Sequence, residues 1–249
     1  MGSLSLVKKA ETFDVRLVSA RLLAPAVREL VLERAGGGIV DFDPGQWMNL
    51  VLPLPTGEVR RAYSIASEPD GSNRFEIAVT RVENGPASTY LHDLPEGSIL
   101  SAIGPQGLFT RDPADPHPAL FVGTGTGVTP LRSMLRAALR CQRGAHLWLL
   151  LGVRHEEDIL YREEMESLAA ERPEVRFVVT LSRPRQTWSG STGHVQNHIP
   201  TLLRELEMAS GVPPHVYVCG LERMVKSVRE LCRGELGIDR KRVHTERYD

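Results

Sequence analysis

The chain has 249 residues, of which 41% are hydrophobic and 24% charged, and its formal net charge is −1. This length suits one large domain or two ordinary ones with real hydrophobic cores, and the balanced charge gives no electrostatic case for nucleic acid or an acidic membrane. No stretch is apolar for long enough to span a membrane, residues 1–6 do not form a secretory signal, and the three separated cysteines form no CxxC metal motif, so we expect a cytoplasmic protein without metal.

Residues 12–109 have the pattern of a small antiparallel β-barrel. Apolar or alternating runs rich in β-branched residues occur at residues 13–18, 30–32, 48–52 and 75–79. Glycine- and proline-rich turn signals separate them at residues 36–38, 44–45, 55–57 and 69–71. Short strands with such close turns are typical of a barrel, and one short helix is expected at about residues 86–94.

The segment 112–118 contains three prolines, which can continue neither a helix nor a central strand. We therefore predict a barrel domain over residues 1–111, a linker over 112–118 and a second domain over 119–249. Strand-like runs in the second domain lie at residues 119–122, 147–151, 175–179 and 216–218. Helix-like runs alternate with them, near residues 130–142, 161–171, 198–209 and 222–236. This alternation predicts an α/β domain with a parallel sheet covered on both faces.

A glycine-rich segment, VGTGTGVTP at residues 122–130, follows a strand and opens a helix. We expect Thr129 as the N-cap and Pro130 as the first helical residue, with free N–H groups facing a pyrophosphate. Val128 stands where G-x-G-x-x-G has its third glycine, and no P-loop lysine follows. The segment alone thus indicates a phosphate site and leaves open a simple packing turn.

Arg154, Ser182 and Arg183 follow two further strands of the same predicted sheet. Ligands of open α/β sheets bind at the carboxyl ends of strands, where arginines can meet a ribose phosphate. Each of these residues alone also fits an ordinary solvated loop.

A second group of residues, Arg61, Tyr63, Ser64 and Ser67, lies on or just after a predicted barrel strand. The arginine suits a phosphate, the tyrosine ring suits stacking and the hydroxyls suit hydrogen bonds. Without further context, a half-buried edge strand with a tyrosine in the core is the favoured interpretation.

Five motifs in fixed order resemble those of the ferredoxin–NADP reductase family. They are Arg-x-Tyr-Ser-x-x-Ser at 61–67, Gly-x-x-Ser at 85–88, Gly-Pro-x-Gly-x-Phe at 104–109, the glycine-rich turn at 123–130 and Cys-Gly-x-x-x-Met at 219–224. Each is weak alone, but the ordered set extends over nearly the whole chain. The resemblance implies an FAD-binding antiparallel β-barrel, an α/β parallel-sheet NAD(P)-binding domain, and hydride transfer between NAD(P)H and flavin.

By this resemblance, Arg61 holds the flavin phosphates, Tyr63 stacks on the isoalloxazine and Ser64 bonds near flavin N5. Ser67, Gly85 and Ser88 complete the FAD site. A second set of residues is expected to bind NADP(H) or NAD(H), with a modest preference for NADPH. These residues are Gly123, Thr124, Gly125, Thr126, Gly127, Arg154, Ser182, Arg183, Cys219, Gly220 and Met224.

The chain end resembles the family ending in which a glutamate precedes an aromatic residue by two positions. Glu246 is then expected near the nicotinamide, and Tyr248 over the flavin face. Asp249 after the aromatic and Leu221 in place of the usual proline depart from the family pattern. The other interpretation of this segment is a final edge strand with one exposed acid.

No cysteine-rich ferredoxin segment is attached. The resemblance therefore implies a separate electron-transfer partner, ferredoxin-like, flavodoxin-like or haem-containing, or a small acceptor. The alternatives are a free-flavin, quinone or ferric reductase and, from another class, a non-catalytic nucleotide-sensing module. The joint presence of Ser64, Cys219, Glu246 and Tyr248 favours an enzyme, because a sensor needs no hydride geometry.

Overall fold

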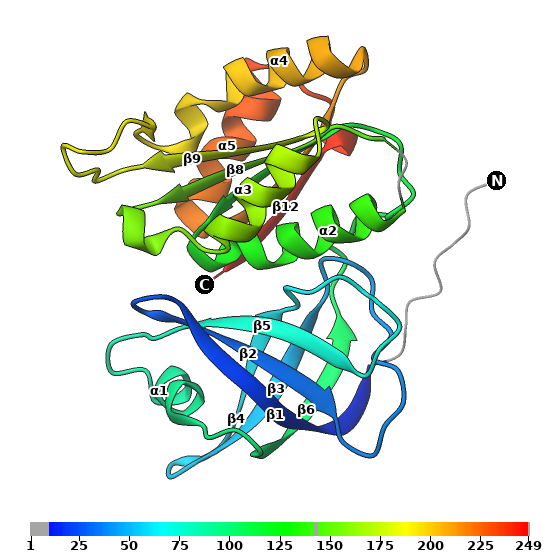
Figure 1. The fold of residues 1–249 in the computed structure, drawn as a ribbon, viewed down its shortest axis with the longest axis vertical. Coiled ribbons are helices and arrows are strands. Elements are labelled where there is room, and N and C mark those ends of the chain that lie inside the picture. Colours follow the sequence, from blue (N-terminus) through cyan, green and yellow to red (C-terminus); the bar gives the residue numbers. More distant parts are fainter. Residues whose placement is uncertain (1–9, 142–143, 249) are drawn as a thin grey trace.

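The computed structural model describes residues 10–141 and 144–248, which form two sheets, one above the other in Figure 1. The amino-terminal sheet is antiparallel and curls around its own core, whereas the carboxyl-terminal sheet is parallel and lies between helices. The predicted pairing of a β-barrel with an α/β domain is confirmed. Residues 1–6, for which no secretory signal is expected, lie outside the described residues.

The barrel has six strands in the order β4-β3-β6-β1-β2-β5. Its two outer strands approach each other at a bridge between Ile65 and Ile77, which closes the curve. Leu30, Met48 and Phe75 are among the side chains buried in its core. The elements are β1 (Glu11–Ala24), β2 (Val27–Arg34), β3 (Trp47–Leu54), β4 (Gly57–Ser64), β5 (Arg74–Thr80), α1 (Pro86–Asp93) and β6 (Ile99–Gln106).

Two barrel strands differ from the sequence-based expectation. The sequence does not predict β6, because Gly104-Pro105 has the pattern of a turn, yet β6 pairs with both β1 and β3. β1 is longer than the expected run 13–18, because two register shifts let it bend and continue pairing with β2 as far as Ala24. The short helix expected at about residues 86–94 is present as α1.

The parallel sheet has the order β10-β9-β8-β7-β11-β12. The chain enters at β7, moves outward through β8 and β9, and then returns to the other side of β7 with β11. Strand order therefore reverses between β7 and β11, and the carboxyl ends of strands at such a reversal are where open α/β sheets bind ligands. The strands are β7 (Ala119–Thr124), β8 (Leu147–Val153), β9 (Val175–Leu181), β10 (Ser191–Thr192), β11 (His215–Leu221) and β12 (Val243–Tyr248).

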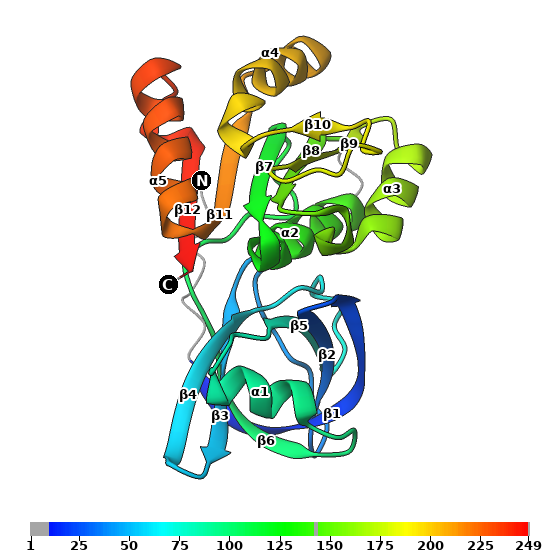
Figure 2. The same cartoon turned by 90° about the vertical axis from the view of Figure 1, so that its left-hand side faces the viewer.

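Helices cover both faces of this sheet (Figure 2). Because neighbouring residues of a strand point to opposite faces, Phe121 packs in the core with α2 and α3, while Leu120 and Val122 pack with α4 and α5. The helices are α2 (Val128–Arg140), α3 (Arg162–Glu171), α4 (Ile199–Ser210) and α5 (Glu222–Glu230). Short 3-10 turns occur at Gly125–Gly127, Glu156–Asp158, Val195–Asn197 and Arg240–Arg242.

The helix expected at 222–236 is not continuous. α5 ends at Glu230, and a π-helical turn, Leu231–Glu235, follows it. Cys232 in this turn is fully buried in the core beneath α5. The wider turn thus keeps an apolar contact where the regular helix ends.

The core beneath α2 and α3 continues into the barrel. Ala66, Ala78 and Phe109 are buried in the same cluster as Met134 and Leu135 of α2. The two domains therefore share an apolar interface in addition to the linker at 112–118. No helix in the described part of the chain is long and apolar enough to cross a membrane.

Candidate functional site

The glycine-rich turn lies at the carboxyl end of β7, beside the reversal of strand order. A 3-10 turn, Gly125–Gly127, leads from Thr124 directly into α2. The expected N-cap role of Thr129 is wrong, because the 3-10 turn already makes helical backbone before it and α2 begins at Val128. The Thr129 hydroxyl instead donates a 2.8 Å hydrogen bond to the carbonyl of Thr126.

The turns after β7 and β11 fit together because glycines occupy both. A Cβ atom on Gly127 would lie 2.3 Å from the carbonyl oxygen of Cys219, and one on Gly220 would lie 2.3 Å from Thr124 Oγ1. Thr124 Oγ1 is buried and has no hydrogen-bond partner among the described residues. Since buried polar atoms are normally hydrogen-bonded, this hydroxyl is an unsatisfied group at the contact between the two segments.

Cys219 lies between Gly123 of β7 and Glu246 of β12 in the strand register. It is fully buried, and burial raises the pKa of its thiol well above the usual value. Glu246 is half-buried, and burial raises the pKa of its carboxyl group from 4.5 to about 7. β12 is an edge strand of the parallel sheet. Its glutamate is nevertheless half-buried and changes charge near neutral pH.

Tyr248 joins the two domains. Its hydroxyl donates a 2.7 Å hydrogen bond to Ser64 Oγ at the end of β4 and lies 3.3 Å from Thr129 Oγ1 in α2. Ser64 is buried and, as the acceptor of this bond, still has its own hydrogen to donate. The expected residues Ser64, Cys219, Glu246 and Tyr248 therefore lie where the barrel meets the carboxyl edge of the parallel sheet.

The arginine and tyrosine of β4 lie two residues apart and so share one face of the strand. Arg61 is exposed and forms no ion pair within residues 10–141 and 144–248, and its guanidinium donates to the carbonyl of Arg60. Tyr63 is half-buried, and burial raises its pKa to about 12. Ser67, beyond the strand, accepts a 3.1 Å hydrogen bond from the N–H of Glu76. The end of β4 thus has an exposed cation and a half-buried aromatic ring on one face and the buried Ser64 on the other.

The hydroxyl of Ser88 at the start of α1 is used within its own loop. It accepts a hydrogen bond from the N–H of Val82 and donates one to the carbonyl of Gly85, both of 3.0 Å. A Cβ atom on Gly85 would lie 2.8 Å from this hydroxyl, so the loop requires glycine there. Both hydrogen-bonding roles of the Ser88 hydroxyl are therefore used within this loop.

The expected ribose-phosphate residues lie together at the ends of β8 and β9. The N–H of Ser182 donates to the carbonyl of Val153 at 3.0 Å, and that of Arg183 to the carbonyl of Arg154 at 2.9 Å. The side chains of Arg154, Ser182 and Arg183 are all exposed. Met224, at the start of α5, flanks Gly220, on which a Cβ atom would lie 2.8 Å from Met224 Cε.

The sequence does not single out Arg132, and it assigns Thr129 only a capping role. These two residues are three positions apart on α2 and therefore share a helix face. Arg132 is buried and donates a hydrogen bond to the carbonyl of Ala66 in the barrel. In the sequence, the sign of such a contact is an arginine within the largely apolar run 131–139.

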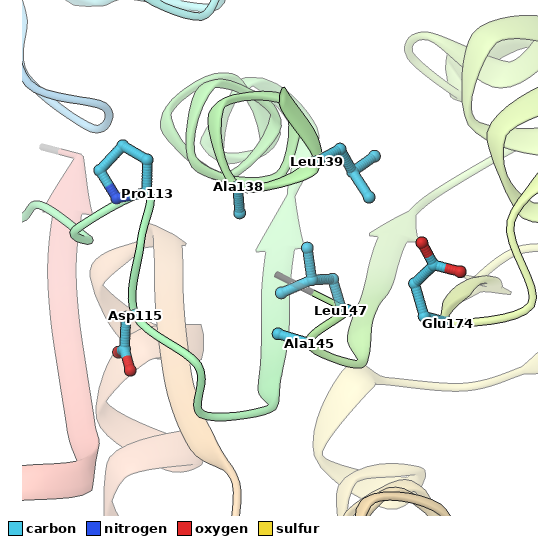
Figure 3. Close-up of a pocket in the computed structure, with 8 residues that line it drawn as sticks. Pro113, Asp115, Ala138, Leu139, Ala145, Leu147 and Glu174 are labelled. Carbon is cyan, nitrogen blue, oxygen red and sulfur yellow. The ribbon is translucent and has the colours of Figure 1, made fainter. Parts of the chain in front are cut away.

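A small pocket elsewhere lies at the opposite, amino-terminal edge of the parallel sheet (Figure 3). Pro113, Ala138, Leu147 and Glu174 are among its lining residues, and its volume of about 10 Å³ has room for a water molecule. We assign it no ligand. No group of three or more His, Cys, Asp or Glu side chains in the described part of the chain could hold a metal ion.

Two family models match the chain, one over each half. The oxidoreductase FAD-binding domain matches residues 14–110, and the oxidoreductase NAD-binding domain matches residues 121–230. The first range falls on the barrel and the second on the parallel sheet.

Individual proteins agree with these matches. The chain is 63% identical to ferredoxin–NADP reductase B of Sorangium cellulosum, over 97% of this chain and 99% of that protein. It is 30% identical to the stachydrine N-demethylase reductase subunit of Rhizobium meliloti, over 90% of this chain and 63% of that protein. A solved structure of an Amycolatopsis cytochrome P450 reductase superposes with a TM-score of 0.82 at 26% identity, over 96% of this chain and 70% of that one. The chain therefore belongs to the ferredoxin–NADP reductase family, as an FAD-dependent oxidoreductase that carries electrons between NAD(P)H and a partner.

Proposed function

We propose that hydride transfer in this enzyme occurs where Ser64, Cys219, Glu246 and Tyr248 meet. The observation that carries the proposal is the hydrogen bond from Tyr248 to Ser64, because it joins the barrel to the ligand-binding edge of the parallel sheet. When bound, FAD supplies the hydride acceptor and NAD(P)H the donor, and the protein supplies positioning and electrostatics.

The barrel residues fit FAD. The exposed guanidinium of Arg61 can bind phosphate oxygens in a bidentate manner, and the half-buried ring of Tyr63 offers a stacking surface. The N–H groups after Gly85 form a second phosphate site at the start of α1. Two separate phosphate sites suit the diphosphate of FAD better than the single phosphate of FMN. Ser67 supports this site by fixing β5 through the N–H of Glu76.

The residues of the parallel sheet fit NADP(H). The buried, unpartnered Oγ1 of Thr124 and the N–H groups of the turn 125–127 suit the pyrophosphate. The exposed arginines 154 and 183, beside Ser182, suit a phosphate on the adenosine ribose. This set supports a modest preference for NADPH over NADH.

The four residues at the proposed site of hydride transfer have different roles. Ser64 would donate its free hydroxyl hydrogen near flavin N5, and Tyr248 would cover the flavin face when no nicotinamide is bound there. Glu246, whose pKa is about 7, holds a proton or a negative charge beside the nicotinamide. The thiol of Cys219 stays protonated and packs against the ring as a small polarisable group. Gly220 and Met224 border the same position.

We propose a ferredoxin-like iron–sulfur protein as the separate electron partner. The name of the Sorangium relative, which covers nearly the whole chain, supports this choice. The likeness to a cytochrome P450 reductase gives some support to a haem acceptor. A flavodoxin-like protein, free flavin, quinone and ferric iron are the other acceptors to be compared.

We also propose domain limits of 1–111 and 119–249, joined by the linker 112–118. β6 ends at Gln106 and β7 begins at Ala119, so the proposed limits contain every strand of each sheet. Cys141, Cys219 and Cys232 are free thiols, which supports a reducing compartment such as the cytoplasm.

The test begins with the purified protein. The cofactor is released with acid and identified by mass, and the protein is then titrated anaerobically with NADPH while the flavin absorbance is followed. We expect FAD and complete bleaching. Recovery of FMN alone would contradict the FAD assignment, and an unbleached flavin would indicate a non-catalytic nucleotide sensor. Stopped-flow mixing of the reduced enzyme with each acceptor class then ranks the partners, and the iron–sulfur protein is expected to react fastest.

A further inference from the structure

Arg132, on the second turn of α2, has the least exposed side chain among the ionic contacts that join the two domains in the described part of the chain. Its side chain is only 5% exposed. On the barrel side, its guanidinium donates to the carbonyl of Ala66 at 2.9 Å and to the carboxylate of Glu76 at 2.6 Å. On the other side, it donates to Glu164 of α3 at 2.8 Å. One side chain thus binds the segment after β4, strand β5 and helix α3, which belong to two domains.

The aromatic ring of Tyr161 also contacts the Arg132 guanidinium. The guanidinium lies 4.3 Å from the ring centre of Tyr161, a cation–π distance, and Tyr161 itself is buried with a left-handed φ of 57°. A buried cation is tolerated only where it is paired and hydrogen-bonded, and Arg132 meets both conditions through two carboxylates and a carbonyl. The planar fork of arginine, which lysine lacks, satisfies these partners at once.

The two segments that Arg132 joins are those that frame the proposed hydride-transfer site. On the barrel side, Ser64 ends β4 and residues 65 and 66 follow it directly. On the other side, residues 129–132 lie in the first turns of α2. The first connection between them runs from Ser64 through the hydroxyl of Tyr248 to Thr129. The second runs from the carbonyl of Ala66 to Arg132. Two connections therefore hold the segments together. Their attachment points are two residues apart on the barrel side, Ser64 and Ala66, and three residues apart on α2, Thr129 and Arg132.

Under the proposed function, the first connection would open during turnover, because Tyr248 would leave the flavin face before the nicotinamide entered. The second connection lies in the buried interface and involves none of the four residues proposed to act at the reacting atoms. We propose that Arg132 is a positioning residue, which keeps the end of β4 at a fixed spacing from α2 while Tyr248 is displaced. This inference rests on the proposed function. It assigns to Arg132 the separation of flavin and nicotinamide in the reacting complex.

Arg136 provides a matched control on the same helix. It lies one turn further along, pairs with Glu68 of the barrel and with Glu164, and is about one third exposed. It therefore also makes an ionic contact between the domains, but in the described part of the chain its guanidinium binds no backbone carbonyl of the segment 64–66. The substitutions Arg132→Lys and Arg136→Lys keep the positive charge but replace the planar guanidinium with an ammonium group.

The experiment compares both variants with wild type as FAD-loaded protein. Stopped-flow reduction by NADPH gives the hydride-transfer rate and the charge-transfer absorbance, deuterated NADPH gives the isotope effect, and NADP⁺ titration gives Kd. Misplacement of about 1 Å can cost roughly a hundredfold in rate, so we expect Arg132→Lys to slow hydride transfer by about tenfold or more. Its Kd should stay near wild type, its isotope effect on kcat should rise and its charge-transfer band should weaken. Arg136→Lys should leave all four unchanged.

A merely stabilising role predicts a different result. In that case Arg132→Lys lowers Tm while the FAD-loaded fraction transfers hydride at the wild-type rate with the wild-type isotope effect, and the inference is overturned. If Arg132→Lys does not fold, Glu76→Gln gives the same test, because it weakens the barrel side of the contact and leaves Arg132 in place. Failure of the proposed function is separate, since wild type itself would then not be reduced by NADPH.

Discussion

Glu246 lies directly beside Cys219 in the register of β11 and β12, and neither side chain is exposed. The thiol cannot ionise near neutral pH, since burial raises its pKa well above the usual value, whereas the carboxyl group has a pKa of about 7. Glu246 is therefore the member of this pair that can change charge in the physiological range.

We expect hydride transfer from NADPH to accelerate as the pH rises through about 7, because an ionised Glu246 stabilises the positive charge that develops on the nicotinamide. An effect of about 1.4 kcal/mol corresponds to roughly tenfold in rate. Glu246→Gln should remove the inflection near pH 7 in stopped-flow profiles. Its persistence in the variant would assign the titration to another group.

The same shift affects stability with a definite sign. Since the folded-state pKa of Glu246 is raised from 4.5 to about 7, the folded state binds the proton more tightly than the unfolded state. Its contribution to the free energy of unfolding should therefore fall as the pH rises between these values. Tm measured across this window should decline more in wild type than in Glu246→Gln.

Removal of the Tyr248 ring should strengthen nicotinamide binding and slow turnover. An aromatic contact is worth about 0.5–1.5 kcal/mol beyond its buried area, so Tyr248→Ser should lower the Kd for NADP⁺ by up to about tenfold. Tyr248→Phe keeps the ring but loses the hydrogen bond to Ser64, and its Kd should fall between those of wild type and Tyr248→Ser. Titrations that follow the charge-transfer band measure both variants. Wild-type binding by Tyr248→Ser would contradict the placement of this ring over the flavin.

Arg183 should select NADPH. Charge-assisted hydrogen bonds contribute about 1.5–3 kcal/mol, so Arg183→Ala should lower kcat/KM for NADPH by at least about tenfold and leave that for NADH nearly unchanged. Arg185→Ala is the control, because Arg185 lies in the same loop but is paired with Glu157 at 3.1 Å. Equal losses with both cofactors would remove Arg183 from the phosphate site.

Gly127→Ala should disturb the site without touching a reacting group. Its Cβ atom would lie 2.3 Å from the carbonyl oxygen of Cys219 and 2.7 Å from Gly220 Cα, and overpacking of this kind costs about 1–3 kcal/mol. We expect a lower free energy of unfolding in urea and a higher KM for NADPH. Gly234→Ala has open space around the added methyl group and should be neutral or slightly stabilising. Similar urea midpoints for the two variants would show that the turns at Gly127 and Gly220 can separate freely.

The arrangement of strands and helices could largely be predicted from the sequence, because buried parallel strands such as β8 have long apolar runs. β6 could not, since its Gly104-Pro105 pair resembles a turn and only the strands on either side establish its pairing. The phosphate-binding turn at 123–127 is visible from glycine spacing alone. Ser64 and Tyr248, by contrast, are 184 positions apart, and the family resemblance was needed to place them in one site.

Arg132 shows a different limit. Helical spacing places it on the same face as Thr129, but its partners Ala66, Glu76 and Glu164 come from three distant parts of the chain. Amphipathic patterning distinguishes apolar from polar faces and treats a charged residue as exposed. Contacts between domains of this kind have no periodic signature.

The apolar cluster shared by Phe109, Ala66 and Met134 has a consequence for how the molecule melts. On this side, each half covers apolar side chains of the other half. Separating the halves would therefore expose these side chains to water. Local opening of one half alone is therefore costly, and the two halves should lose structure cooperatively in a single transition. For the same reason, halves produced by cleavage within 112–118 should stay associated until denaturant separates them.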